Sequence, residues 1–281
     1  MSLEKGFPWG YQGWEFTGYS IAGITTSILC RTASLCFDVG QGLPFQMGAR
    51  HIALSHAHMD HASGLPYLLS QKTMAGQKDT TVYLPPSLKG PMEKVIGIWQ
   101  GVEEFDYPAS LQALSPGDAV ELGKNFTLRP FRTVHRVESQ GYLLLQGKKS
   151  LSEKFQGASR EEIIAAKKRG EKVEEESLAP MVAYTGDTQI EFLGIDPEVA
   201  KAKILFVEVT FWDDERPVAE ARRWGHLHFD ELVEALPRLQ NERVVLIHTS
   251  VRYSTEYLET LLKRRLSAAD RERVVLFPRP N

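Results

Sequence analysis

The segment from Ser55 to His61 reads Ser-His-Ala-His-Met-Asp-His and places three imidazoles and one carboxylate within six positions. It follows directly on a short apolar run, which is typical of the end of a buried strand. His56 and His58 are two residues apart, so at a strand end they can point to the same side and bind one metal ion. Asp60 and His61, on the turn that follows, can reach a second ion. A single histidine is most often structural, but a group of this density predicts a metal site.

Three further potential ligands follow other apolar runs rich in β-branched residues, and they are His135, Asp187 and His248. Each therefore lies at the carboxyl end of an expected strand. Open α/β sheets place their ligands along this edge, so groups that are far apart in sequence can converge there. Taken alone, His135 is equally consistent with a structural histidine. Because other potential ligands accompany it, we interpret His135 as a ligand.

The elements that must position these residues alternate between short apolar strands and helical patterns, which indicates an α/β layered architecture. We expect a hairpin over Gly18 to Asp38. We expect strands near Arg50–Ser55, Thr81–Leu84, Phe126–Val134, Gly141–Gln146, Met181–Thr185, Ile204–Val209, Arg243–Ile247 and Arg273–Phe277. We expect helices over Ser87–Trp99, Arg160–Arg169, Phe229–Leu239 and Thr255–Leu266.

The composition is that of an ordinary globular protein, with 281 residues, 42% of them hydrophobic, and a net charge of −3. This charge gives no overall attraction to polyphosphate, so a nucleic-acid partner would need a local basic patch. No apolar run is long enough for a membrane span and the first residues do not resemble a signal peptide, so we expect a cytoplasmic protein without a membrane partner. Cys30 and Cys36 lack the spacing of a metal finger and are interpreted as reduced thiols.

One stretch resembles an insertion into a single domain that spans residues 1–281. It runs from Lys148 to Glu176 and holds eight basic and seven acidic residues. A helix is expected to begin after Ser159, because serine is a typical N-cap residue. Such a stretch is either a solvated helix and loop or a surface that contacts the substrate.

The pattern His-x-His-x-Asp-His, followed by a distant His, a Gly-Asp-Thr and a late His, resembles the metallo-β-lactamase superfamily. The resemblance implies an α/β fold of four layers, an αββα sandwich, with two divalent metal ions between its sheets. Carried onto this sequence, it implies the following ligands: His56, His58 and His135 for one metal, Asp60, His61 and His248 for the other, and Asp187 between both. The di-iron oxygen reductases of this superfamily typically carry Glu where this chain has His58. The nitrogen-rich set therefore favours Zn²⁺, with Mn²⁺ as the alternative, over redox iron.

The later segments are similar to ribonuclease Z. They are Phe37–Gly42, Tyr184–Thr188, Val207–Phe211, Gly225–Leu227 and Ile247–Tyr253. The resemblance implies a phosphodiesterase that uses a metal-bridged hydroxide, with Asp60 orienting it. His226 would be the catalytic acid and Glu208 would fix its tautomer. Thr188, Ser250 and Arg252 are candidate phosphate contacts. The expected substrate is an RNA 3′ end or a smaller phosphodiester.

Two departures argue against a tRNA precursor as substrate. The stretch Gly18–Leu29 lacks the Pro and Arg-Asn that ribonuclease Z usually carries, and residues 148–176 show no long Gly/Pro-rich arm. One alternative keeps the metals but cleaves a thioester, lactone or lactam. Another is a non-catalytic binding module on the same fold. Relatives are often homodimers. Aromatic residues near the N-terminus could form a dimer interface, although such residues more commonly pack on the core. His51 and His228 receive no role.

Overall fold

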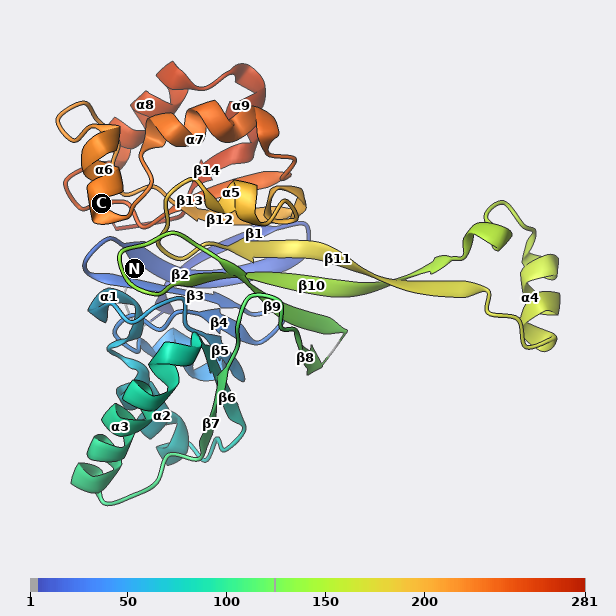
Figure 1. The fold of residues 1–281 in the computed structure, drawn as a ribbon, viewed down its shortest axis with the longest axis horizontal. Coiled ribbons are helices and arrows are strands. Elements are labelled where there is room, and N and C mark those ends of the chain that lie inside the picture. The colour runs from blue at the N-terminus through green and yellow to red at the C-terminus, as the bar shows by residue number, and fades with distance from the viewer. Residues whose placement is uncertain (1–4, 124, 281) are drawn as a thin grey trace.

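A computed structural model describes residues 5–123 and 125–280. Two seven-stranded sheets are stacked face to face (Figure 1). The first sheet has the order β1 to β7, and the second runs β14-β13-β12-β11-β10-β9-β8. The strands of the first sheet are β1 (Phe7–Tyr11), β2 (Trp14–Ile21), β3 (Thr25–Cys30), β4 (Leu35–Phe37), β5 (His51–Ala53), β6 (Thr80–Leu84) and β7 (Ala109–Ala113). Those of the second are β8 (Val120–Gly123), β9 (Phe126–Arg132), β10 (Gln140–Leu151), β11 (Glu174–Tyr184), β12 (Ile204–Glu208), β13 (Arg243–Ile247) and β14 (Val274–Leu276).

The inner faces of the two sheets share one apolar core. Phe16 and Phe37 of the first sheet belong to the same buried cluster as Tyr184 and Phe206 of the second. Phe37 stacks on Tyr184 with ring centroids 4.9 Å apart. Strands buried on both faces read as continuous apolar runs, as β12 does, because helices cover the opposite side.

Helices cover both outer faces. α2 (Leu65–Met74) and α3 (Pro86–Glu103) pack on the first sheet, while α5 (Phe192–Ile195), α7 (Phe229–Ala235) and α8 (Thr255–Arg265) pack on the second. The predicted four-layer α/β sandwich is therefore confirmed. Shorter helices complete the chain: α1 (Met59–Ala62), α4 (Arg160–Lys168), α6 (Val218–Trp224) and α9 (Ala268–Arg273). Within the described residues, no helix is both long and apolar enough to cross a membrane.

Strand directions bring several carboxyl ends to one edge. β11, β12 and β13 are parallel neighbours, and β9 runs in the same direction as β11 because both are antiparallel to β10. β5 of the first sheet is parallel to β4 and β6. At this edge the two sheets are joined through backbone atoms, since the Gln140 amide donates to the carbonyl of Ser55 at 3.0 Å.

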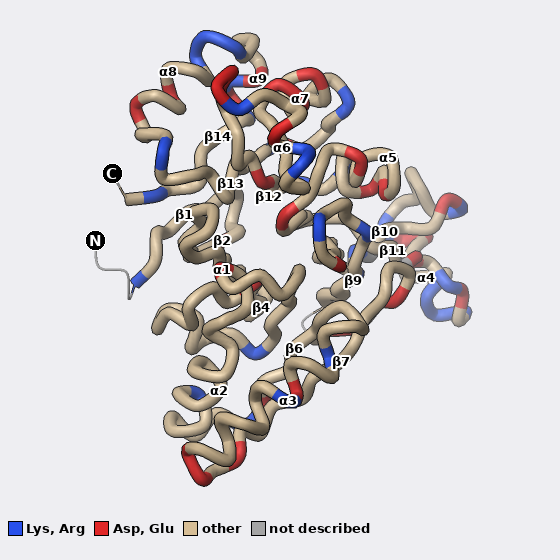
Figure 2. The backbone as a smooth tube through the Cα atoms, turned by 60° about the vertical axis from the view of Figure 1, so that its left-hand side comes forward, with Lys and Arg blue, Asp and Glu red and all other residues tan. Residues whose placement is uncertain are grey.

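The strands β10 and β11 continue beyond the body of the protein as a two-stranded arm that ends in α4 (Figure 1). We expected strands only over Gly141–Gln146 and Met181–Thr185, so that expectation was too short. The outer halves of both strands are charged and lack an apolar face, yet their backbones pair from Gln146 with Ala179 to Leu151 with Glu174. Basic residues and Glu both lie on this arm (Figure 2).

The tip of the arm has a small core of its own, made by Phe155, Ala166 and Val173. Helix α4 begins at Ser159, whose hydroxyl accepts from the Glu162 amide while the Glu162 carboxylate accepts from the Ser159 amide. This reciprocal capping agrees with the helix start that the sequence indicated.

Several elements were not predicted from the sequence. They are β1, β7, β8, α1, α2, α5, α6 and α9, and α1 replaces the turn expected for Asp60 and His61. β7 and β8 lie at sheet edges and have only five and four residues, so their apolar alternation is too short to stand out. The helix expected over Phe229–Leu239 is shorter, because Pro237 follows α7 and the chain continues as a 3₁₀ turn over Leu236–Arg238.

Candidate metal centre

The predicted ligands come from both sheets and meet where the strands end. His56 and His58 follow β5, and Asp60 and His61 lie on α1. The remaining three follow strands of the second sheet: His135 after β9, Asp187 after β11 and His248 after β13. The structure thus brings all seven together at the edge where we expected them to converge.

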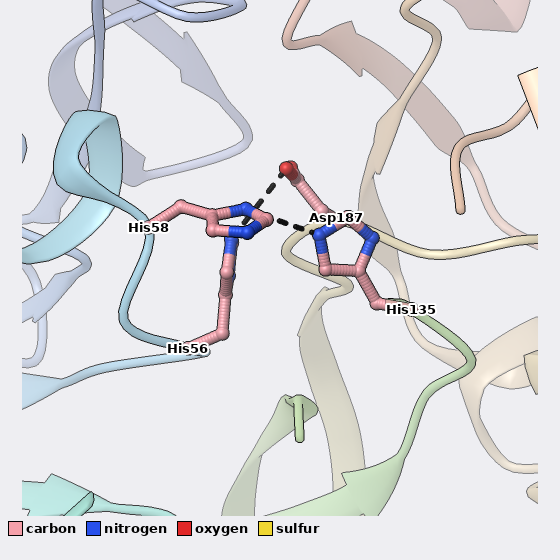
Figure 3. Close-up of side chains that lie close together, drawn as sticks. All are labelled: His56, His58, His135 and Asp187. Atoms are coloured by element: carbon pink, nitrogen blue, oxygen red, sulfur yellow. Dashed lines mark hydrogen bonds and ion pairs between the residues drawn. The ribbon is translucent and has the colours of Figure 1, made fainter. Parts of the chain in front are cut away.

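One group of side chains comprises His56, His58, His135 and Asp187, whose candidate ligand atoms all lie within 4.8 Å of one another (Figure 3). His135 Nε2 lies 3.2 Å from His58 Nδ1, and His56 Nε2 lies 3.6 Å from Asp187 Oδ2.

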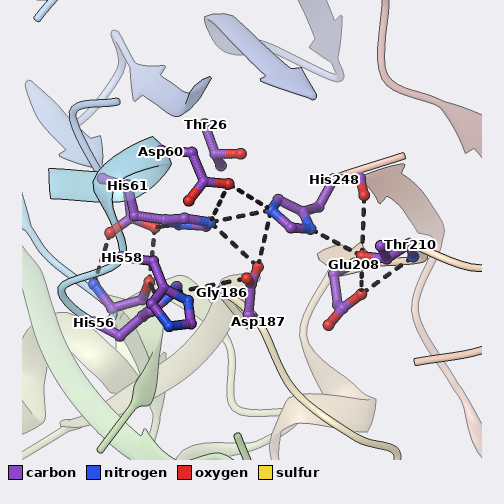
Figure 4. Close-up of polar contacts among 12 residues, drawn as sticks. Thr26, His56, His58, Asp60, His61, Gly186, Asp187, Glu208, Thr210 and His248 are labelled. Carbon is purple, nitrogen blue, oxygen red and sulfur yellow. Dashed lines mark hydrogen bonds and ion pairs between the residues drawn. The ribbon is translucent and has the colours of Figure 1, made fainter. Parts of the chain in front are cut away.

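A second group comprises Asp60, His61 and His248 (Figure 4). His248 Nε2 lies 3.2 Å from His61 Nε2 and 3.3 Å from Asp60 Oδ2. Asp187 reaches this group as well, because its Oδ1 lies 3.3 Å from His61 Nε2 and 3.4 Å from His248 Nε2. Asp187 therefore faces one group with each carboxylate oxygen.

The nitrogens of these imidazoles that point away from the centre are fixed by hydrogen bonds. His61 Nδ1 donates to Asp38 Oδ2 at 2.7 Å, and His135 Nδ1 donates to the carbonyl of Gly225 at 2.7 Å. His248 Nδ1 lies 2.9 Å from the hydroxyl of Thr210. That hydroxyl donates to Glu208, so it accepts from the imidazole. Such partners leave the opposite nitrogen unprotonated and facing the centre, as a metal ligand requires.

His56 is held in the same way. Its Nδ1 lies 2.9 Å from the Ser55 hydroxyl, which donates to Asp38 Oδ2 at 2.7 Å and so accepts from the ring. The backbone makes room for this packing at Gly186, which has a φ of +59° and where a Cβ would lie 2.5 Å from the Ser55 Cβ.

The centre contains polar atoms that nothing in the described protein satisfies. His56 Nε2 and Asp187 Oδ1 are buried and make no hydrogen bond within the described residues. Buried polar atoms are almost always paired, and a bound cation is a common reason for an exception. Imidazole nitrogens with carboxylate oxygens at these separations suit zinc and similar transition ions. The residues present therefore fit divalent metals.

The protonation states of His56 and Asp187 suit metal ligands. Burial lowers the pKa of His56 well below its usual value, which favours the neutral, ligating form. Burial alone would raise the pKa of Asp187, but the adjacent His248 and His61 outweigh it and hold that pKa well below the usual value. The carboxylate is thus ionised.

His226 and Glu208 form a pair beside this centre. His226 Nδ1 lies 2.8 Å from Glu208 Oε1, and His226 also lies 3.8 Å from Asp187 Oδ2. Glu208 is fully buried and accepts from the Thr188 amide and the Thr210 hydroxyl, so its position is fixed. Burial lowers the pKa of His226, but the Glu208 carboxylate outweighs burial and raises the pKa to about 9.

A cavity of about 590 Å³ opens over the centre. Ser250 and Arg252, two of the three predicted substrate contacts, line it together with His58, Asp60, Asp187, His226 and His248. Thr188 does not line it. Its side chain is buried, its hydroxyl donates to the carbonyl of Gln189, and its amide supports Glu208. We therefore remove Thr188 from the candidate phosphate contacts.

The two histidines without a predicted role lie outside the centre. His228 is the N-cap of α7, where its side chain accepts from the Asp230 amide. His51 lies on β5, with Nδ1 3.3 Å from the hydroxyl of Tyr83.

Sequence reasoning did not assign two residues that hold the ligands in place, Asp38 and Thr210. Asp38 follows β4, as the ligands follow their strands, and it lies in the segment Phe37–Gly42 that resembles ribonuclease Z. Its contact with His61, 23 residues away, arises only from the fold.

Comparison with known proteins agrees with this geometry. Residues 44–249 match the family model described as a Beta-lactamase superfamily domain. The tRNase Z TRZ1 of Arabidopsis thaliana is 30% identical over 259 residues, with 92% of each chain covered. A ribonuclease Z of Haloferax volcanii is 27% identical over 252 residues, covering 79% of this chain and 77% of that protein.

Solved structures show the same fold. The metallo-β-lactamase fold protein YhfI of Bacillus subtilis superposes with a TM-score of 0.64 at 17% identity, and the short form of human tRNase Z with 0.61 at 17% identity. Each comparison covers 94% of this chain and 95% of the other. The family implies divalent metals, and the cluster described above is able to bind them. The chain therefore belongs to the metallo-β-lactamase superfamily, within its ribonuclease Z-like group, and is a metal-dependent hydrolase.

Proposed function

We propose that this protein hydrolyses a phosphodiester bond, at an RNA 3′ end or in a smaller phosphodiester, and that zinc is its metal. The observation that carries this proposal is the His226–Glu208 pair, 2.8 Å apart, beside the metal centre. Cleavage of a phosphodiester releases an alkoxide, which needs a proton. A thioester releases a thiolate, which is a better leaving group than an alkoxide and needs such an acid less, so the pair favours the phosphodiester over a thioester.

In this proposal His56, His58 and His135 hold one metal, Asp60, His61 and His248 hold the other, and Asp187 lies between them. The five imidazoles make the donor set nitrogen-rich, which favours zinc. Metals bound there would supply a water of lowered pKa and would neutralise charge on the phosphoryl oxygens.

The side chains of the protein then orient the reactants. Asp60 lies on the cavity wall, where its carboxylate would orient the attacking water. His226 donates a proton to the leaving oxygen from Nε2, because Nδ1 is engaged by Glu208. Arg252 and Ser250 contact the phosphate from the rim of the same cavity.

RNA is the favoured substrate class because named tRNase Z proteins are similar over most of the chain. Whether a tRNA precursor is bound depends in part on the arm. The arm's charges nearly balance, with eight basic and seven acidic residues, and some of them pair, as Lys154 does with Glu171 and Lys167 with Glu174. Such pairs neutralise its field, and this argues against strong nonspecific attraction of RNA. The cytoplasmic location and the homodimer stay predictions.

The test compares the wild type with His226→Ala, both loaded with zinc, on bis(p-nitrophenyl) phosphate and on an RNA with a 3′ extension. We expect the variant to keep its metal and to lose about 10²- to 10⁴-fold in turnover of the RNA, whose leaving alkoxide needs a proton. Turnover of bis(p-nitrophenyl) phosphate should fall much less, because p-nitrophenolate leaves without one. Unchanged turnover of the RNA would exclude the proposed acid. Hydrolysis of a lactone or thioester without phosphodiesterase activity would overturn the proposal. Gel retardation of a tRNA precursor at two salt concentrations shows whether this RNA binds to the protein.

A further inference from the structure

The cavity over the metal centre has an aromatic side chain at its rim, Trp224. This residue ends α6 and directly precedes the segment Gly225–His226 that contacts the site. It lines the cavity and is 44% exposed, which is unusual for the largest apolar side chain. Nothing in the described protein covers this exposed part of the ring.

The ring of Trp224 is held in one orientation by two neighbours. The guanidinium of Arg136 lies 4.8 Å from the ring centroid. The indole Nε1 donates to Glu220 Oε1 at 2.7 Å, one turn earlier on α6. Arg136 lines a separate hollow beside the cavity, so it approaches the ring from the neighbouring side.

The backbone also fixes the tryptophan relative to the metal centre. Gly225 has a φ of +78°, and a Cβ there would lie 2.9 Å from His135 Nδ1 and 2.9 Å from the Arg136 amide nitrogen. The segment that carries Trp224 is thus packed tightly against the segment that carries His135. A ring held this rigidly loses little entropy when a ligand stacks on it.

The same cavity combines aromatic rings with cations. Phe211 and Tyr253 line it with Trp224, and Arg216 and Arg252 line it as well. Neither guanidinium makes an ion pair with any residue in the described part of the chain. Aromatic faces beside unpaired cations are the chemistry that recognises a nucleobase and its phosphate together.

We propose that Trp224 is a stacking platform for the nucleobase that flanks the scissile phosphate. This inference rests on the proposed phosphodiesterase function and deepens it, because it makes the substrate a nucleotide chain rather than any phosphodiester. Stacking tolerates every base, since each has an aromatic face, so the platform adds affinity without sequence preference. Arg136 and Glu220 are positioning residues that act through the ring.

A binding experiment tests the platform without relying on cleavage. The affinities of the zinc-loaded protein for adenosine 5′-monophosphate and for ribose 5-phosphate are measured by calorimetry. We expect the nucleotide to bind about tenfold more tightly in the wild type. Trp224→Ala should abolish this ratio, and Trp224→Phe, which keeps an aromatic face, should retain most of it. Trp99→Ala is the control, because Trp99 is 50% exposed on α3, outside the cavity lining.

Equal affinity of the wild type for the two probes, or a ratio that survives Trp224→Ala, would overturn the platform. Metal content and thermal midpoint show whether each variant is folded. If Trp224→Ala is unfolded, the comparison of the wild type with Arg136→Gln decides. Arg136→Gln loosens the ring and should reduce the ratio about two- to fivefold, and an unchanged ratio in Arg136→Gln would also contradict the proposal.

A second measurement places the platform at the reacting bond. An RNA with a 3′ extension is compared with the same RNA that lacks the base on either side of the cleavage site. We expect Trp224→Ala to raise KM about tenfold on the intact RNA and to leave KM unchanged on one abasic RNA. An equal rise on all RNAs would contradict the placement. Failure of the wild type to cleave any RNA or bis(p-nitrophenyl) phosphate would overturn the proposed function, while the calorimetric ratio would still report on the platform.

Discussion

Asp38 and His61 are joined by a hydrogen bond of 2.7 Å between Oδ2 and Nδ1, and both side chains are buried. The same carboxylate accepts from the amide and the hydroxyl of Ser55 and from the hydroxyl of Tyr184. Asp38 therefore ties together the ligand turn after β5, the inner face of the second sheet and the end of β4. It also has a φ of +51°, a strained value for a residue with a side chain.

We predict that Asp38→Asn weakens zinc binding by about 10- to 100-fold, because the amide no longer holds the tautomer and orientation of His61. The affinity is measured by competition with a coloured chelator. Asp79→Asn provides the control, since Asp79 is an exposed carboxylate far from the centre. Equal zinc affinities for the wild type and Asp38→Asn would show that Asp38 does not support the ligand.

Glu208→Gln tests the positioning of His226. The amide cannot stabilise the charged imidazole as the carboxylate does, so we expect turnover of an RNA with a 3′ extension to fall about 100-fold. KM and bound zinc should change little, because Glu208 contacts no predicted ligand other than through Thr210. The pH profile should also shift, which a purely structural role would not cause. A variant with wild-type turnover and pH profile would contradict this role.

Removal of the metal should destabilise the protein, because it leaves His56 Nε2 and Asp187 Oδ1 buried without a hydrogen bond in the described residues. Zinc at a hundredfold excess over its dissociation constant stabilises the folded state by about 2.7 kcal/mol. For a chain of this size we expect chelation to lower the thermal midpoint by about 5–10 °C. Differential scanning calorimetry measures this shift, and added zinc should restore it. Identical midpoints with and without chelator, or preparations that never retain metal, would argue against a metal centre.

Because both cysteines are buried, we predict that the stability of the folded protein falls at alkaline pH. Burial raises the pKa of both the Cys30 and Cys36 thiols to about 12 from an ordinary value of 9.0. Between these values the unfolded chain releases protons that the folded chain retains, so stability is full below about pH 9 and falls as the pH rises toward 12. Each thiol contributes a slope of up to about 1.4 kcal/mol per pH unit.

This dependence is measured as the urea midpoint of the wild type and of the double variant Cys30→Ala/Cys36→Ala between pH 8 and 10.5. The double variant should lose stability less steeply. The comparison concerns the slopes, because the smaller side chains also lower the absolute stability. Parallel slopes would show that the thiols ionise equally in both states. Both thiols should also resist alkylation in the folded protein at neutral pH.

The central strands of the second sheet could be predicted from the sequence because they are buried on both faces. β12 and β13 read as unbroken apolar runs, and the polar residues at their carboxyl ends stand out against them. The convergence of His135, Asp187 and His248 followed from that pattern and from the rule that parallel strands end at one edge.

The rest depended on information that is not local. The outer halves of β10 and β11 are stabilised by pairing with each other, not by an apolar face, so their charged sequences resembled a solvated loop. The burial of Asp38, and of Thr188 behind Glu208, is decided by side chains from the opposite sheet and from neighbouring strands. The hydrophobic periodicity of a sequence gives no information about such contacts.

The division of the ligands between two sheets has a consequence for biosynthesis. A nascent chain has released four of the seven groups once residue 61 has left the ribosome, but His248 follows almost two hundred residues later. Its amide then docks on the Ser20 hydroxyl of β2 at 2.9 Å, which requires both sheets to be assembled. With the ligand set proposed above, ion capture is a late event that marks finished molecules, and it does not nucleate their folding.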